Sequence, residues 1–322
     1  MKQKMTLKED DHTMNMSYFS LSDALRAAFG PDAEIAGQKR VYGGDINDAW
    51  ELQLSGGQRI FMKTNQIKNA RFFETEQRGL EAMRSTGAIG VPNLLGTGID
   101  RQRDFSFLLL DYIDSAPKIR DYWEVFGRQL AQMHRADCMD FVRTHLPEGQ
   151  PSAVEETRYG FVEDNYIGAM VQKNTPKASW TDFYRDCRLL PQIRMAERYF
   201  NPGLRRKLDR FLSCLDDYIR EPEFPSLVHG DLWGGNVLCG GDGRAWLIDP
   251  AAYVGDFETD LAMTELFGRF PQAFYDAYHE VNPIDPGYRE RKRLYQLYHL
   301  LNHLNLFGGS YLGSVAAIVD AL

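Results

Sequence analysis

The stretch 227–238, LVHGDLWGGNVL, sets the expected fold of this chain. It places an aspartate, an asparagine and three glycines between two short apolar runs. Glycine adopts positive φ at little cost and lets other groups come close to the backbone, so the segment is predicted to form a tight loop between two short strands. The polar residues of the loop decide whether it also carries chemistry.

These polar residues are spaced as in the catalytic loop of a kinase. Asp231 and Asn236 are five residues apart, and Asp249 follows 13 residues after Asn236, at the end of the apolar run AWLI. Kinases use a catalytic-loop Asp beside the attacking hydroxyl, an Asn five residues later and an Asp after the next strand. Each residue alone is typical of a turn or a strand end, but the joint spacing favours a kinase. We therefore predict Asp231 as the proton acceptor, and Asn236 and Asp249 as Mg²⁺ ligands.

The periodicity of the chain changes near residue 114. Before it, residues 34–65 and two later runs alternate in polarity as antiparallel strands do, and residues 70–85 carry a helical apolar stripe. After it, helical periodicity dominates, with two short strands around 227–228 and 245–248. The prediction is an α+β, bilobed fold: a flexible tail over 1–19, a small antiparallel-sheet lobe over 20–113, and a larger, mainly helical lobe over 114–322.

A buried ion pair is predicted in the first lobe. Lys63 lies on the strand RIFMKT, from which an ammonium can reach nucleotide phosphates. Glu76 lies within the apolar stripe of the following helix, so it should face the sheet, where a carboxylate needs a cationic partner. We therefore pair Glu76 with Lys63, and we assign Glu74 to an exposed pair with Arg78, four residues later.

Two further segments are candidates for nucleotide contact. Gly43 and Gly44, in the turn VYGGDIN, could direct backbone amides at the β- and γ-phosphates, although the turn lacks the GxGxxG spacing and also suits a plain hairpin. The backbone of Asp111, Tyr112 and Ile113, where the last strand of the sheet ends, could hold an adenine or could be a simple linker.

Taken with these motifs, the chain resembles the fructosamine-3-kinase (ketosamine kinase) family, within the aminoglycoside phosphotransferase and protein-kinase-like fold. The resemblance runs from about residue 20 to 312, through FETEQRGLEAM, YGFVEDNYIG, HGDLWGGNVL and LIDPAAYVGDFETDLAM. The combination of HGDLWxGN with DPA separates this family from aminoglycoside and choline kinases.

The resemblance implies the substrates and some further roles. It implies ATP and Mg²⁺ as cofactors, phosphorylation of the O3' hydroxyl of a free or protein-bound ribulosamine or fructosamine, and a protein-deglycation repair role. Trp233 would then pack against the sugar or its amine-bearing tail, or serve as a structural aromatic, and His229 is placed with it at the substrate. Many family members carry Cys where this chain has Asp45, so a disulfide at that turn is not expected.

Asp256 and Asp260 are expected to brace loops rather than to catalyse.

Composition and charge argue against other partners. The chain has 322 residues and a formal net charge of −8, which does not suit a nucleic-acid binder. Its N-terminus has no apolar export segment, and no stretch approaches 18 uninterrupted apolar residues, so no membrane contact is predicted. Four scattered cysteines without a CxxC pair favour reduced thiols. We expect a cytoplasmic monomer.

Two alternatives remain open at this point. An aminoglycoside- or choline-type phosphotransferase would use the same catalytic loop on a cationic substrate. A nucleotide-binding pseudokinase would keep the fold without turnover, although the four central polar residues Lys63, Asp231, Asn236 and Asp249 are all present. The sequence does not distinguish ribulosamine from fructosamine.

Overall fold

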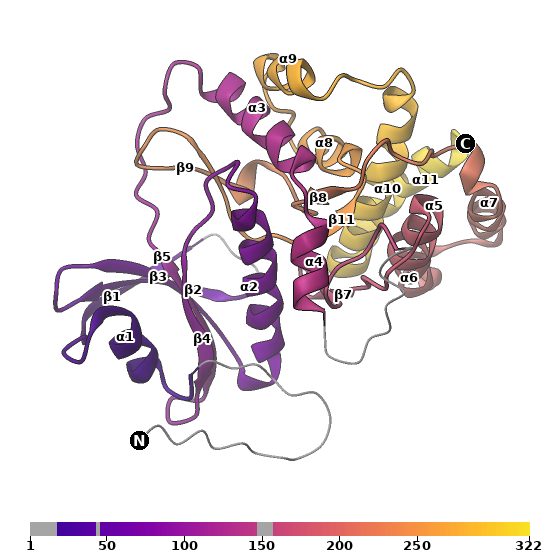
Figure 1. The fold of residues 1–322 in the computed structure, drawn as a ribbon. Coiled ribbons are helices and arrows are strands. Elements are labelled where there is room, and N and C mark those ends of the chain that lie inside the picture. The colour runs from indigo at the N-terminus through magenta and orange to yellow at the C-terminus, as the bar shows by residue number, and fades with distance from the viewer. Residues whose placement is uncertain (1–17, 43–45, 147–156) are drawn as a thin grey trace.

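The structure is a computed structural model, and it describes residues 18–42, 46–146 and 157–322. It has the predicted α+β architecture: an antiparallel sheet formed by the first third of the chain stands beside a mainly helical part (Figure 1). The predicted phosphate-binding glycines Gly43 and Gly44, together with Asp45, lie outside the described residues. No helix within the described ranges has both the length and the apolar character that crossing a bilayer requires.

Five antiparallel strands form the main sheet in the order β1-β2-β3-β5-β4. Their bounds are β1 Ile35–Val41, β2 Asp48–Leu54, β3 Arg59–Asn65, β4 Leu94–Asp100 and β5 Phe105–Asp111. In the central strand β3, Lys63 pairs with Ala49 on one side and with Leu108 on the other. Because β3 has a neighbouring strand on each side, the side chain of Lys63 must project from one face of the sheet.

The two faces of the sheet are covered by different helices. Helix α1, Leu21–Phe29, is capped by Ser20, whose hydroxyl accepts from the amide of Asp23 at 3.0 Å, and it packs on the face that carries Leu109. Helix α2, Ala70–Ser85, packs on the opposite face, which carries Leu108. Because successive side chains of a strand point to opposite faces, β5 contributes to both cores.

The core under α2 continues into the helical part of the chain. Phe73 and Leu80 of α2 belong to the same buried cluster as Phe126, Leu227 and Leu247. The helices of this part are α3 Tyr122–Arg135, α4 Met139–His145, α5 Trp180–Phe183, α6 Leu190–Met195, α7 Pro202–Ser213, α8 Glu258–Thr264, α9 Gln272–Val281, α10 Tyr288–Phe307 and α11 Leu312–Asp320, with a π-helical stretch Tyr184–Leu189 and 3₁₀ turns at Glu197–Tyr199, Leu215–Asp217, Gly234–Asn236 and Gly309–Tyr311. One further 3₁₀ turn, Ile67–Asn69, joins β3 to α2 in the sheet part.

Three small two-stranded ladders arrange the loops of the helical part. They pair β6 Asn165–Ile167 with β7 Met170–Gln172, β8 Ser226–Val228 with β11 Tyr253–Gly255, and β9 Val237–Cys239 with β10 Ala245–Leu247. Strands β8 and β10 are the two that the sequence predicted. The other strands of these ladders were missed because three residues are too few for alternation to stand out.

Candidate active site

The segment 229–236 joins β8 to β9 and forms a tight loop whose backbone is closely packed. Gly230 has φ +81°, and a Cβ placed there would lie 2.1 Å from the carbonyl oxygen of Ala251. The amide of Ala251 in turn donates to the carbonyl of His229 at 2.9 Å. Only glycine fits at position 230, because any side chain would collide with backbone on the neighbouring segment.

A buried carboxylate, that of Asp260 on α8, holds this loop. It accepts hydrogen bonds from the backbone amides of His229 and Gly230, at 2.7 and 2.9 Å, and its Oδ2 lies 3.1 Å from Nε2 of His134. Burial alone would raise the pKa of Asp260, but the interactions with His134 and His229 outweigh it and lower the pKa overall. The expectation that Asp260 braces a loop is confirmed. Asp256 similarly accepts from the amide of Glu258 at 3.0 Å.

Asp231 and Asn236 face each other across the loop. The Nδ2 group of Asn236 donates to the carbonyl of Asp231 at 2.8 Å and to its carboxylate at 3.1 Å. Burial raises the pKa of Asp231 to about 7; the hydrogen bond from Asn236 acts against this rise, and the charges of Asp249 and Asp260 add to it. The carboxylate is therefore poised to take up and release a proton near neutral pH.

Lys63 lies between two carboxylates that come from distant parts of the chain. Its ammonium is 2.6 Å from Oε1 of Glu76 and also pairs with the carboxylate of Asp249. Burial alone would lower the pKa of Lys63, but the two carboxylates raise it overall, so the ammonium stays charged. The predicted pair with Glu76 is thus confirmed, whereas the predicted pair of Glu74 is wrong, because Arg78 contacts Glu81 instead, at 3.1 Å.

The backbone brings Asp249 close to the loop in an uncommon conformation. Asp249 has φ +56°, which is uncommon for residues other than glycine, although Asp tolerates it better than most, and such backbone often occurs at functional sites. The amide of Ile248 donates to the carbonyl of Asn236 at 3.1 Å. This bond extends the β9–β10 ladder, so that Asp249, the residue after Ile248, comes near the other predicted metal ligand, Asn236. The side chain of Asp249 is 44% exposed, so it remains open to a ligand although it pairs with Lys63.

The two predicted substrate residues have different surroundings. Trp233 is 39% exposed, and its ring covers the backbone of Gly235, so it is not a core aromatic. His229 is fully buried, with Nε2 2.9 Å from the carbonyl of Ile248 and Nδ1 accepting from the amide of Asp231 at 3.2 Å. Both ring nitrogens fix the loop that carries Asp231, and substrate contact by His229 stays a prediction.

The predicted adenine-binding segment begins at Asp111, the last residue of β5, at the junction of the two parts. The amide of Asp111 donates to the carbonyl of Asn93 at 3.0 Å, and the guanidinium of Arg59 lies 4.5 Å from the ring centre of Tyr112. These contacts hold the segment against the sheet. Nucleotide contact by Asp111, Tyr112 and Ile113 stays a prediction.

Sequence reasoning missed the polar groups that support this site from a distance. The side-chain amides of Asn165 and Gln172 donate to the carbonyls of Ala252 and Ala251, close behind Asp249. These residues are about 80 positions apart from their acceptors, so no local spacing could connect them. The motif EDNYIG contains Asn165, but nothing in the local sequence marks its distant acceptor.

Comparison with known proteins identifies the family of the chain. The family model described as "Fructosamine kinase" matches residues 18–322. A "Probable ketoamine kinase" of Synechocystis sp. is 38% identical over 91% of this chain and 92% of its own length. The chloroplastic protein-ribulosamine 3-kinase of Arabidopsis thaliana is 35% identical over 90% of this chain and 84% of its own length.

Solved structures show the same fold. A Thermobifida fusca protein, solved as a candidate fructosamine-3-kinase, superposes with a TM-score of 0.76 at 32% identity, over 95% of this chain and 99% of the other. An amicoumacin kinase solved with AMP-PNP and Ca²⁺ shares the fold alone, with a TM-score of 0.52 at 12% identity over 90% of this chain and 87% of the other. From its sequence and its fold, this chain belongs to the fructosamine kinase family.

Proposed function

We propose that this kinase transfers the γ-phosphoryl group of ATP to the O3' hydroxyl of a ketoamine, a sugar joined to an amine as in ribulosamine or fructosamine. The observation that carries the proposal is the convergence of Asp231, Asn236 and Asp249 with the Lys63–Glu76 pair at one junction. The names of the ketoamine and ribulosamine kinases among its relatives support the substrate class.

The donor atoms at the site suit Mg²⁺. Within the described residues, both hydrogen bonds of the Asn236 side chain use Nδ2, which leaves Oδ1 available to a cation. The carboxylate of Asp249 is partly exposed and adds a second hard oxygen donor. Mg²⁺ prefers such oxygen ligands and, when bound, would neutralise charge on the nucleotide phosphates.

Asp231 is proposed to accept the proton of the substrate hydroxyl. The hydroxyl oxygen forms a bond to the γ-phosphorus, and the bond from that phosphorus to the β–γ bridging oxygen breaks, with its electron pair leaving on ADP. The hydroxyl proton passes to the carboxylate of Asp231, whose pKa of about 7 suits a group that must take up a proton and then release it. Asn236 keeps that carboxylate oriented through its hydrogen bond.

Lys63 is proposed to position the nucleotide phosphates. Its ammonium is held on one side by Glu76, so it has a fixed direction before the nucleotide arrives. Its second partner, Asp249, is also a proposed metal ligand. When Mg²⁺ and the nucleotide bind, the carboxylate of Asp249 would pair with the metal and the ammonium of Lys63 with the phosphates, in place of their present pair with each other. A protonated lysine in this place provides a compact positive charge for phosphate oxygens.

Trp233 is proposed to contact the sugar or the amine-bearing part of the substrate. Trp233 is two residues after the proposed proton acceptor Asp231 in the same loop, and its ring is partly exposed. The choice between ribulosamine and fructosamine, a role in protein repair, a cytoplasmic location and a monomeric state stay predictions from the sequence.

The test is a substrate panel with the purified chain and Mg-ATP. Ribulosamine, fructosamine, choline and kanamycin would be compared by ADP release, and the phosphorylated position of the product would be assigned by NMR. We expect turnover with the ketoamines and a phosphate on O3'. Turnover with choline or kanamycin alone would favour the alternative phosphotransferase. Nucleotide binding without turnover of any ketoamine would favour the pseudokinase.

A further inference from the structure

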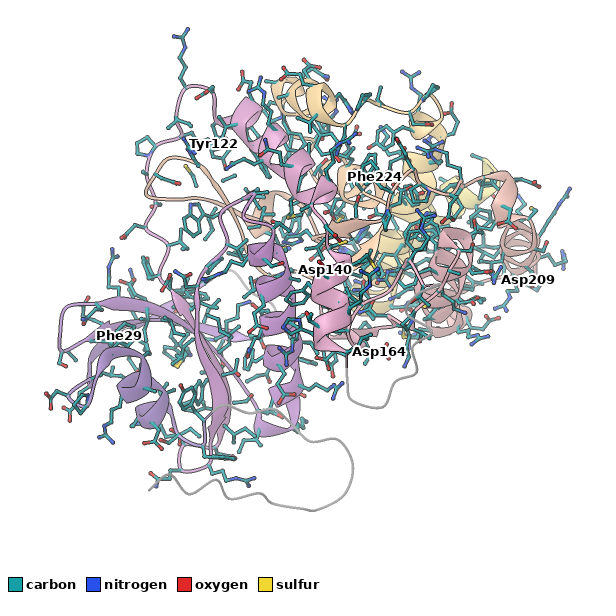
Figure 2. The ribbon with its side chains drawn as sticks, in the orientation of Figure 1. Phe29, Tyr122, Asp140, Asp164, Asp209 and Phe224 are labelled. Carbon is teal, nitrogen blue, oxygen red and sulfur yellow. The ribbon has the colours of Figure 1, made fainter. Side chains whose placement is uncertain are left out.

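The hairpin formed by β6 and β7 contacts helix α2 with one of its faces. The ring of Tyr166 lies 4.2 Å from that of Phe72, centre to centre and edge-on at 62°. Next to this contact, Arg71 pairs with Glu163 at 2.9 Å. Phe72 is one helical turn before Glu76, so the hairpin touches α2 on the side that carries the partner of Lys63. Figure 2 labels Asp164, at the start of the hairpin.

The other face of the same hairpin holds the segment that follows Asp249. Asn165 donates from Nδ2 to the carbonyl of Ala252 at 2.8 Å, and Gln172 donates from Nε2 to the carbonyl of Ala251 at 2.9 Å. Both side chains are almost fully buried. Side chains alternate along a strand, which explains how Asn165 and Tyr166 reach opposite sides.

A buried network fixes these amides. Gln172 donates to Oδ1 of Asn165 at 2.8 Å and accepts from the hydroxyl of Tyr298 at 2.7 Å. Asn174 donates to the same Oδ1 at 2.9 Å and accepts from the guanidinium of Arg188 at 2.9 Å. A buried network in which each amide is satisfied on both sides is rigid, because moving one member leaves another without a partner.

The tip of the hairpin is held as well. Gly168 has φ +61°, and a Cβ placed there would lie 3.0 Å from Leu306 on α10 and 3.5 Å from Ile46, which follows the predicted phosphate-binding turn. One face of the hairpin therefore lies against α2 of the sheet part, and the other lies against the segment after Asp249 in the helical part. Its tip lies close to residues of both parts, Ile46 and Leu306.

From these contacts we infer that the β6–β7 hairpin sets the distance between Glu76 and Asp249, and so places the ammonium of Lys63 for the nucleotide. Lys63 is bound by two carboxylates on separate elements, and the hairpin is packed between those elements. Tyr166 is thus a positioning residue that acts through Glu76, and Asn165 and Gln172 are positioning residues that act through Asp249. The inference rests on the proposed role of Lys63, but it does not depend on which substrate accepts the phosphate.

The test measures nucleotide affinity in the full-length protein, with Mg-AMP-PNP as the probe. We expect Tyr166→Ala to raise the dissociation constant about tenfold, and Tyr166→Phe, which keeps the ring, to stay within about twofold of wild type. In a Glu76→Gln background, Tyr166→Ala should add less than about twofold, because two residues that act through one contact are not additive.

A matched control separates positioning from loss of stability. Tyr218 makes a similar edge-on contact with Phe211, at 5.4 Å and 68°, near α7, which Figure 1 shows at the far side of the helical part. Tyr218→Ala should lower the melting temperature about as much as Tyr166→Ala does, and leave the affinity for Mg-AMP-PNP unchanged.

The outcomes separate this inference from the proposed function. Equal effects of Tyr166→Ala in the wild-type and Glu76→Gln backgrounds, or an unchanged affinity in the wild-type background, would overturn the inference alone. Wild-type protein that does not bind Mg-AMP-PNP would overturn the proposed kinase function, and the inference with it. Binding without turnover of any ketoamine, together with the non-additive pattern, would support the inference and overturn the proposed substrate.

Discussion

The side-chain amide of Asn236 donates a hydrogen bond to the carboxylate of Asp231 at 3.1 Å, and a second one to its backbone carbonyl at 2.8 Å. One residue thereby orients the proposed proton acceptor and keeps its own Oδ1 for a cation. The proposed proton-accepting role of Asp231 and the proposed metal-binding role of Asn236 are thus joined through a single amide group.

Replacing Asp231 by Asn should remove the proton acceptor but keep the shape of the loop. We expect Asp231→Asn to lower turnover of a ketoamine by about 10²-fold or more, with nucleotide affinity within about threefold of wild type. ADP release and equilibrium binding would be measured on the same preparations. Asp209→Asn, an exposed change on α7, is the control and should behave as wild type. Turnover by Asp231→Asn at the wild-type rate would contradict the role.

The pH dependence of activity should reflect the raised pKa of Asp231, about 7. A proton acceptor works only when it is unprotonated, so kcat/KM for Mg-ATP should rise with pH and level off above about pH 7. Bound Mg²⁺ favours the charged carboxylate, so the corresponding limb in kcat should lie at lower pH. Profiles of wild type between pH 5 and about 9 would measure both limbs. A kcat/KM that stays constant down to pH 5 would speak against Asp231 as the group that titrates.

Removing the ammonium of Lys63 should weaken nucleotide binding. In Lys63→Met, Glu76 and Asp249 would lose the cation between them, and the phosphates would lose a charged donor. We expect the KM for Mg-ATP to increase about tenfold or more, with a smaller change in the KM for the ketoamine. Lys207→Met, which removes an exposed lysine paired with Asp320, is the control. An unchanged KM for Mg-ATP would remove Lys63 from the nucleotide site.

Trp233 offers a test of substrate contact that is separate from stability. Because the ring is 39% exposed, Trp233→Leu should shift the melting temperature by only about 2 °C. The KM for the ketoamine should rise about fivefold or more, and Trp233→Phe should recover most of this loss because it keeps an aromatic face. A large loss of thermal stability with an unchanged KM would instead identify Trp233 as a structural aromatic.

Gly230 and Gly234, in the same loop, should respond differently to an added methyl group. A Cβ at Gly230 would lie 2.1 Å from the carbonyl oxygen of Ala251 at a φ of +81°, whereas a Cβ at Gly234 meets no atom within 4 Å. We expect Gly230→Ala to lower the free energy of unfolding by about 2 kcal/mol or more, and Gly234→Ala by less than about 0.5 kcal/mol. Urea denaturation of both variants measures the difference, and equal effects would contradict the close approach at Gly230.

Short-range sequence patterns predicted the catalytic-type loop and the pairing of Glu76 with Lys63. The spacing of Asp231 and Asn236 placed both on one loop, and the helical stripe placed Glu76 on the face of α2 that meets Lys63. The loop prediction used the five-residue spacing of a kinase catalytic loop, and the Glu76 prediction used the helical period of 3.6 residues. The α+β class followed from this helical period and from the two-residue period of strands.

Long-range contacts and side-chain directions could not be predicted in this way. His134 reaches Asp260 across 126 positions, and Asn165 reaches Ala252 across 87. The prediction that His229 lies at the substrate did not include the direction of its ring, because closeness to Asp231 in the sequence does not fix that direction. In the structure its ring turns toward Ile248, into the interior.

The buried cluster that joins α2 to the helical part has a thermodynamic consequence. Phe73 and Leu80 of α2 share one apolar interior with Leu247, which precedes the proposed metal ligand Asp249. Separating the sheet from the helices would expose this interior to water, so neither part is expected to be a self-sufficient folding unit. Heat should therefore melt the chain in one cooperative step, with the candidate active site disappearing together with the core behind it.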